Sequence, residues 1–171
     1  GTELMIAPIT EKTAGRFKTA KTTVWLPKGT WYDFFTDVKY EGDIQLNVYR
    51  KIDTMPIFVK EGGIVPLDSQ PELTGTRLPE IIDWHIFPGA SNSFELVEDD
   101  AGKRAVTRLE LDWENHAVSL TVTGDSEISP EKRQHRLCFH HMKAEDMLLD
   151  NATQEVIFDN ESPATSIHHE W

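Results

Sequence analysis

Hydrophobic and polar residues alternate with a period of two along much of this 171-residue chain. Such alternation is typical of β-strands that bury one face and turn the other to water. In one run, Ile82, Trp84 and Ile86 should face a core, whereas Asp83 and His85 should face solvent. No window of a dozen residues has the period of a helix, so the pattern predicts an all-β fold. The clearest alternating runs are 44–49, 82–86 and 118–123.

Turn-forming residues separate these runs at intervals of roughly 8–15 residues, which is the spacing expected of antiparallel β-sandwiches. Glu61-Gly62-Gly63 is one such turn signal, and it divides two apolar runs. Each of those runs contains a proline, Pro56 in the first and Pro66 in the second. Because proline has no backbone N–H to donate, each should lie at a strand start, at a sheet edge or at a bulge.

Charge is distributed unevenly along the chain, which carries 17 basic and 29 acidic residues for a formal net charge of −12. Residues 1–78 hold 10 basic and 10 acidic residues, whereas residues 79–171 hold 7 and 19. The polar stretch 67–79, which contains two prolines, coincides with this step and is the best linker candidate. The sequence therefore predicts two small antiparallel β-sandwich domains in tandem, 1–78 and 79–171.

Composition excludes several classes of protein. The 39% of hydrophobic residues is too high for disorder, and no apolar run approaches the ~18 residues that span a membrane. The acidic balance argues against a nucleic-acid partner, because binding phosphates needs clustered Lys and Arg. We therefore expect neither a membrane nor a nucleic acid as a partner. The lone cysteine excludes an internal disulfide and favours a cytoplasmic location.

Candidate catalytic and metal-binding residues are weakly supported. The sequence lacks a G-x-S-x-G elbow, a phosphate-binding glycine loop and an H-E-x-x-H motif. Glu98-Asp99-Asp100 is interpreted as a solvated hairpin turn, and Cys138 as a structural residue flanked by core positions. His135, His140 and His141 cluster in sequence, but their spacing lacks the partners of a zinc site. The sequence therefore predicts no catalytic residue, no metal and no cofactor, and the role of these histidines stays open.

Five aromatic residues fall within eleven positions: Trp25, Trp31, Tyr32, Phe34 and Phe35. Exposed Trp and Tyr rings can stack on sugar rings, whereas buried ones supply large apolar area and a hydrogen-bonding tip. The buried interpretation is favoured for so small a sandwich. Carbohydrate binding through Trp31 and Tyr32 is kept as the alternative.

Several segments together resemble a known family. Residues 24–36 read VWLPKGTWYDFFT, residues 52–66 read IDTMPIFVKEGGIVP, and residues 1–9 read GTELMIAPI. In order and spacing, these blocks resemble those of family 31 glycoside hydrolases, the α-glucosidase and α-xylosidase family. Residues 94–102, FELVEDDAG, are similar to a hairpin of that family, with Val97 in place of its usual Tyr and Ala101 inserted before Gly102.

The resemblance implies that this chain is the proximal (1–78) and distal (79–171) C-terminal β-sandwich of such an enzyme. In that family the nucleophile and the acid/base aspartate lie in a preceding (β/α)₈ barrel, and the blocks that carry them are absent here. The resemblance thus implies a retaining α-glycosidase as the parent, acting on α-glucosides or related glycosides, with its missing barrel as the partner of this region. The residues carried over are structural: Trp31, Tyr32, Asp33, Pro56, Gly62, Gly63 and Pro66.

Other functions stay open at this stage. The aromatic content allows a carbohydrate-binding module, and the acidic second half allows an oligomerisation surface. The chain starts with Gly1 rather than Met, already inside a strand pattern at 4–9, so we expect a piece of a longer protein. The first hypothesis remains a non-catalytic region that braces the barrel, and the oligomeric state cannot be predicted.

Overall fold

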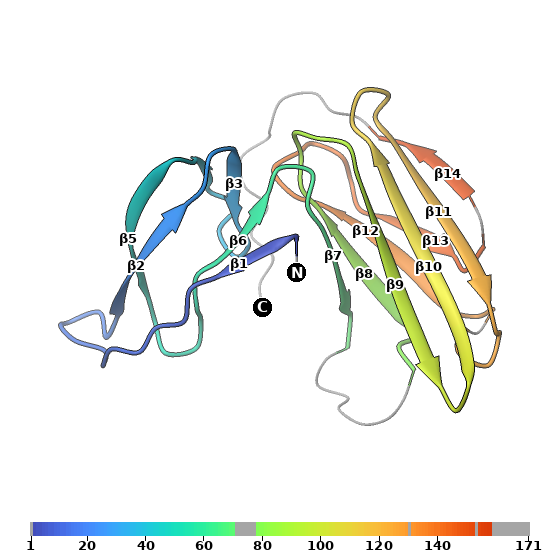
Figure 1. Ribbon diagram of the computed structural model, residues 1–171, viewed down its shortest axis with the longest axis horizontal. Coiled ribbons are helices and arrows are strands. Elements are labelled where there is room, and N and C mark those ends of the chain that lie inside the picture. Colours follow the sequence, from blue (N-terminus) through green and yellow to red (C-terminus); the bar gives the residue numbers. More distant parts are fainter. Residues whose placement is uncertain (1, 71–77, 130, 153, 159–171) are drawn as a thin grey trace. The chain divides into compact units, whose positions relative to one another are not determined.

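The structure, a computed structural model, describes residues 2–70, 78–129, 131–152 and 154–158. Within these ranges the regular elements are all β-strands, without helix or barrel (Figure 1), which confirms the predicted all-β class. None of the described residues belongs to a helix that could cross a membrane. The strands are β1 (Leu4–Ile6), β2 (Ala20–Leu26), β3 (Thr30–Asp33), β4 (Lys39–Glu41), β5 (Ile44–Arg50), β6 (Ile57–Lys60), β7 (Ile64–Asp68), β8 (Ile81–Ile86), β9 (Asn92–Asp100), β10 (Lys103–Asp112), β11 (Ala117–Gly124), β12 (Gln134–Phe139), β13 (Met147–Asp150) and β14 (Gln154–Ile157).

The chain divides into two compact units between Glu61 and Gly62. The sequence places the boundary later, at the charge step after residue 78. β7 belongs to the second unit because it pairs with β8, from Ile64 opposite Ile86 to Asp68 opposite Ile82. Most of the predicted linker 67–79 lies outside the described residues, namely 71–77. The assignment of the two units to proximal and distal family domains stays a prediction.

The first unit contains a four-stranded sheet in the order β1-β6-β3-β4 and a two-stranded sheet, β2-β5. Every pairing in it is antiparallel. β2 shows why this sequence forms a strand, since Val24 and Leu26 are buried while Thr23 before them and Trp25 between them are exposed. The buried residues enter a small core that also contains Phe58.

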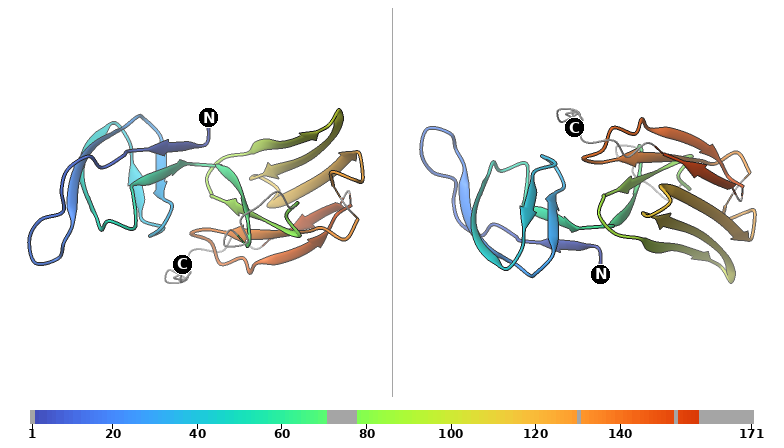
Figure 2. Two further views of the ribbon diagram at one scale, coloured as in Figure 1. Left: turned by 90° about the horizontal axis from the view of Figure 1, so that it is seen from below. Right: turned by 90° about the horizontal axis from the view of Figure 1, so that it is seen from above.

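The second unit is a sandwich of two four-stranded sheets, β14-β11-β10-β9 and β13-β12-β8-β7, which form two layers in Figure 2. Both sheets contribute to one core. Trp84 of β8, Leu109 of β10 and Leu120 of β11 are fully buried in it. β7 lies at a sheet edge, as predicted for a strand that contains Pro66, and Pro56 directly precedes β6.

One pairing in the second unit is parallel, that of β8 with β12. Strands β9, β10 and β11 intervene in the other sheet, so the chain returns beside β8 in the same direction rather than as a hairpin. The predicted alternation along β8 is present, with Ile82, Trp84 and Ile86 in the core. Asp83 and His85 on the opposite face are also buried, however, where the pattern predicted contact with water.

Candidate functional site

Asp33 ends β3 and organises the turn that follows it. Its Oδ1 accepts hydrogen bonds from the backbone N–H groups of Phe35 at 3.1 Å and Thr36 at 3.3 Å. Its other oxygen forms an ion pair with Arg50 at the end of β5. The carboxylate is buried, with 1% of the residue exposed. Local turn chemistry and a cation from the other sheet of the unit therefore account for this aspartate, and both oxygens are engaged.

Trp31 and Tyr32, the residues singled out as alternative sugar-binding positions, precede it on β3. Trp31 is half-buried against the core of the first unit, and its Nε1–H donates to the carbonyl of Pro27 at 2.9 Å. Tyr32 is 4% exposed. Burial, followed by the charges of Glu61 and Glu41, raises the pKa of Tyr32 to about 12. A ring with so little exposed surface offers no face for a sugar to stack on, so the geometry gives that alternative no support at Tyr32.

Gly62 lies in the turn between β6 and β7 in a conformation that favours glycine, with φ = 71°. A Cβ on this residue would lie 2.4 Å from the carbonyl oxygen of Ala90, closer than any real contact. Its own N–H donates to the carbonyl of Pro88 at 3.1 Å, and its carbonyl accepts from Asn92 Nδ2 at 3.0 Å. The glycine pair predicted as a tight turn thus provides close backbone packing inside the second unit.

Two other residues of the matched blocks also have structural partners. Pro56 is buried, and its carbonyl accepts from the N–H of Ala7 at 3.0 Å. Gly63 is buried, and its carbonyl accepts from the N–H of Phe87 at 3.0 Å. These backbone bonds fix the segments on either side of β6 within their own units.

A buried polar cluster covers the face of β8 and β12 that points away from the sandwich core. Ligand atoms of Asp83, His85 and Cys138 lie within 4.8 Å of one another. Arg136 donates to both oxygens of Asp83, at 2.9 and 2.6 Å. Nδ1 of His85 lies 2.7 Å from Nε2 of His140. The sequence correctly placed Cys138 on the face opposite Leu137 and Phe139, but not its partners.

The protonation of this cluster bears on what it could do chemically. Burial, followed by the charges of Asp146 and Asp83, raises the pKa of the Cys138 thiol to about 12, so it is protonated at neutral pH. A metal ligand or a nucleophile would have to be the thiolate. The Asp83 carboxylate already accepts two hydrogen bonds from the Arg136 guanidinium. His140 stacks on Phe87 with ring centroids 4.3 Å apart. Asp83, His85 and Cys138 are the residues that could hold a metal, but their contacts are those of a structural network.

The three histidines that cluster in sequence do not form one site. His135 points into the sandwich core, where its Nδ1 accepts from Trp84 Nε1 at 3.0 Å and its Nε2 lies 2.8 Å from Asn151 Oδ1. Burial is the main cause that lowers the pKa of His135. His140 belongs to the polar cluster on the opposite face of the sheet. His141 has a left-handed backbone, with φ = 50°, and is half-buried.

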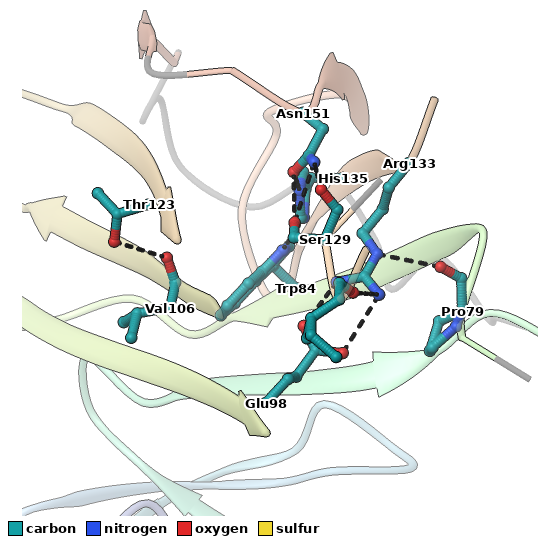
Figure 3. Close-up of polar contacts among 10 residues, drawn as sticks. Pro79, Trp84, Glu98, Val106, Thr123, Ser129, Arg133, His135 and Asn151 are labelled. Carbon is teal, nitrogen blue, oxygen red and sulfur yellow. Dashed lines mark hydrogen bonds and ion pairs between the residues drawn. The ribbon is translucent and has the colours of Figure 1, made fainter. Parts of the chain in front are cut away.

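Arg133 forms a second buried network that sequence patterns did not indicate (Figure 3). Its side chain is fully buried and donates to both oxygens of Glu98, at 2.6 and 3.2 Å. It also donates to the carbonyls of Pro79 at 3.1 Å and Ile128 at 3.2 Å. The interpretation of Glu98 as part of a solvated turn is therefore wrong for this residue, although Asp99 and its neighbour Asp100 are exposed.

Retaining glycoside hydrolysis needs two carboxyl groups about 5 Å apart, one a nucleophile and the other an acid. Three carboxylate residues are buried in the described part of the chain, and each forms an ion pair with a basic side chain. A carboxylate held by a neighbouring cation is a poor general acid, because the cation stabilises its ionised form. The pairs are Glu3 with Lys60, Asp33 with Arg50 and Asp83 with Arg136.

Comparison with known proteins places this fold among the β-domains that accompany glycoside hydrolases. Residues 1–65 match the sequence profile of the glycosyl hydrolase family 31 C-terminal domain. The chain is 30% identical over 130 residues to an α-xylosidase of Saccharolobus solfataricus, covering 71% of this chain, and 24% identical over 169 residues to α-glucosidase 2 of Bacillus thermoamyloliquefaciens, covering 93%. It therefore belongs to the C-terminal domain region of family 31 and is homologous to α-xylosidases and α-glucosidases.

Solved structures agree with this assignment. An α-xylosidase of Xanthomonas citri covers 92% of this chain with a TM-score of 0.67 at 22% identity, and shares the fold. A dextranase of Flavobacterium johnsoniae, solved with isomaltotriose, covers 85% with a TM-score of 0.60 at 26% identity. The chain spans 17% and 21% of the length of the two curated relatives, and 19% of each of these two structures.

Proposed function

We propose that this region is a non-catalytic C-terminal part of a retaining α-glycosidase, which hydrolyses α-glucosides or related α-glycosides in a separate catalytic (β/α)₈ barrel. The region braces that barrel and does not take part in the chemistry. The relatives support this assignment, because the chain corresponds to only about a fifth of their length.

One observation carries the non-catalytic part of the proposal, namely that each buried carboxylate in the described ranges is paired with a cation. Asp33 illustrates it, since it lies inside the most specific matched block and is the most deeply buried carboxylate of the three. Its oxygens are used by its own turn and by Arg50. A residue engaged in this way stabilises the fold and is not positioned to attack or protonate a glycosidic bond.

The test is an assay of the purified 171-residue chain on 4-nitrophenyl α-D-glucoside and 4-nitrophenyl α-D-xyloside. The α-xylosidase of S. solfataricus serves as the positive control. We expect no release of nitrophenol by the chain above the buffer rate. Turnover that persists through purification and is lost in an Asp33→Asn variant would contradict the non-catalytic role, because it would assign the chemistry to this region.

A further inference from the structure

The two-stranded sheet β2-β5 has one face in the core and one face open to solvent. Val24 and Leu26 of β2 and Val48 of β5 lie on the buried face. The register places three pairs of residues directly opposite each other on the other face, and all six side chains are exposed. In order along the ribbon, these pairs are Trp25 with Gln45, Thr23 with Asn47, and Lys21 with Tyr49. We call these six residues the open face.

Aromatic rings mark the two ends of the open face. Trp25 is 54% exposed and Tyr49 is 57% exposed, which is unusual for side chains of this size. They lie on different strands and are separated by four positions along the ribbon, or about 14 Å. A single sugar ring cannot contact both side chains, whereas an oligosaccharide of several units can.

The residues between the rings are uncharged and able to form hydrogen bonds. The Thr23 hydroxyl donates to Asn47 Oδ1 at 3.0 Å, which orients the amide across the strands. The amide of Gln45 is exposed beside Trp25. Amides and hydroxyls offer both donors and acceptors, the combination that sugar hydroxyls require.

The charge of the open face also distinguishes the kind of ligand. Residues 1–78, which contain the open face, hold 10 basic and 10 acidic residues, and the six residues of this face include no carboxylate and only one cation, Lys21 at one end. A neutral ligand rich in hydroxyl groups would leave no carboxylate desolvated when it covers this surface. A basic protein surface would find no anionic partner here.

We propose that the open face binds a neutral oligosaccharide, with Trp25 and Tyr49 stacking on sugar units that are not adjacent. This site goes beyond the bracing role, since it would bind an oligosaccharide substrate at a position outside the catalytic barrel. That the bound sugars are α-linked rests on the proposed function. This site uses two aromatic residues other than Trp31 and Tyr32, the residues of the earlier sugar-binding alternative, and Tyr49 lies outside the sequence blocks that resemble family 31.

The experiment is a titration of the 171-residue chain by calorimetry and by ¹⁵N NMR, with maltoheptaose, isomaltotriose, cellohexaose and glucose as probes. We expect an α-linked oligosaccharide to bind with a millimolar or lower Kd and to shift the amides of β2 and β5. Glucose should bind much more weakly. Trp25→Ala and Tyr49→Ala should each weaken binding about tenfold. Phe17→Ala, which removes an aromatic ring that is 76% exposed outside the open face, is the matched control and should change nothing.

The outcomes separate this inference from the proposed function. Binding of cellohexaose alone at the open face would support the site but count against an α-glycosidase as the parent. Absence of heat and of shifts with every probe would overturn the site and leave the bracing role intact. Concentration-dependent dimerisation that Trp25→Ala abolishes, without sugar binding, would also overturn it, because a second copy would then be the occupant. Thermal unfolding of each variant confirms that the fold is retained.

Discussion

At the scale of single residues, buried charged side chains of this region form ion pairs with side chains of opposite charge. Asp33 is tied to its own turn and to Arg50, Asp83 to Arg136, and Glu98 to the fully buried Arg133. A buried ion pair of this kind contributes little net stability. Removing one partner is nevertheless destabilising, because it leaves the other charge buried and unpaired. The residues that a search for catalytic carboxylates would select are therefore expected to matter for folding.

We predict that Asp33→Asn lowers the free energy of unfolding by about 2–3 kcal/mol, since Arg50 loses its charged partner while the amide can keep the turn bonds. Urea unfolding followed by Trp fluorescence measures the change. Asp53→Asn alters an exposed aspartate of the same unit and should shift stability by less than about 0.5 kcal/mol. Equal effects of the two substitutions would mean that the pair with Arg50 is irrelevant to folding.

The pH dependence of stability should follow two buried acids. In the folded chain the pKa of Cys138 rises from 9.0 to about 12 and that of Tyr32 from 10.0 to about 12. Between these values the unfolded chain releases protons that the folded chain retains, so stability is fully present below pH 9 and falls as pH rises toward 12. Urea unfolding at pH 8.0 and 9.5 should show a loss that Cys138→Ala removes and Tyr32→Phe does not. A loss that is identical in all three proteins would contradict the assignment to the thiol.

At the scale of elements, the alternating pattern predicted strands such as β5, β8 and β11 and the residues of β8 that enter the core. It did so because a strand's periodicity is a local property of the chain. The pattern could not predict that Asp83 and His85 are buried, because their cover comes from partners such as Arg136 and His140, more than fifty residues away. The pattern could not predict the parallel pairing of β8 with β12 for the same reason, since this pairing depends on the path of the chain through three intervening strands.

The sequence predicted the positions of turns better than the burial of polar residues, but at Gly62 it did not show why glycine is required. The sequence indicated a tight turn, whereas the need for glycine also depends on Ala90 in a distant loop. We predict that Gly62→Ala costs about 3 kcal/mol or more, from the unfavourable φ and from the clash with the Ala90 carbonyl. Gly102→Ala is the control, because Gly102 has φ = 84° but no atom within 4 Å of an added Cβ, and it should cost only about 1–2 kcal/mol. Thermal unfolding compares them, and equal losses would exclude the clash.

At the scale of the whole molecule, charge and structure divide the chain at different places. The charge step follows residue 78, whereas the compact units meet between Glu61 and Gly62. Composition reports where charged residues accumulate, but the units are defined by which strands pair. β7 lies before the charge step and pairs with β8 after it.

This difference predicts that the second unit needs β7. A chain that starts at residue 62 should be more stable than one that starts at 79 by about 3 kcal/mol or more, since Ile64 and Val65 are both buried on β7. Chemical unfolding of the chains 62–171 and 79–171 measures the difference. If both unfold at the same denaturant concentration, the boundary belongs at the charge step instead.

We propose that this region stabilises a catalytic barrel and leaves the chemistry to it. The test is the rate of heat inactivation of the proposed parent enzyme, expressed with and without these 171 residues. We expect that removing them lowers the temperature of half-inactivation by about ten degrees, while kcat of the surviving enzyme changes less than about twofold. An unchanged inactivation temperature, or a large fall in kcat at a temperature where the barrel stays folded, would contradict it.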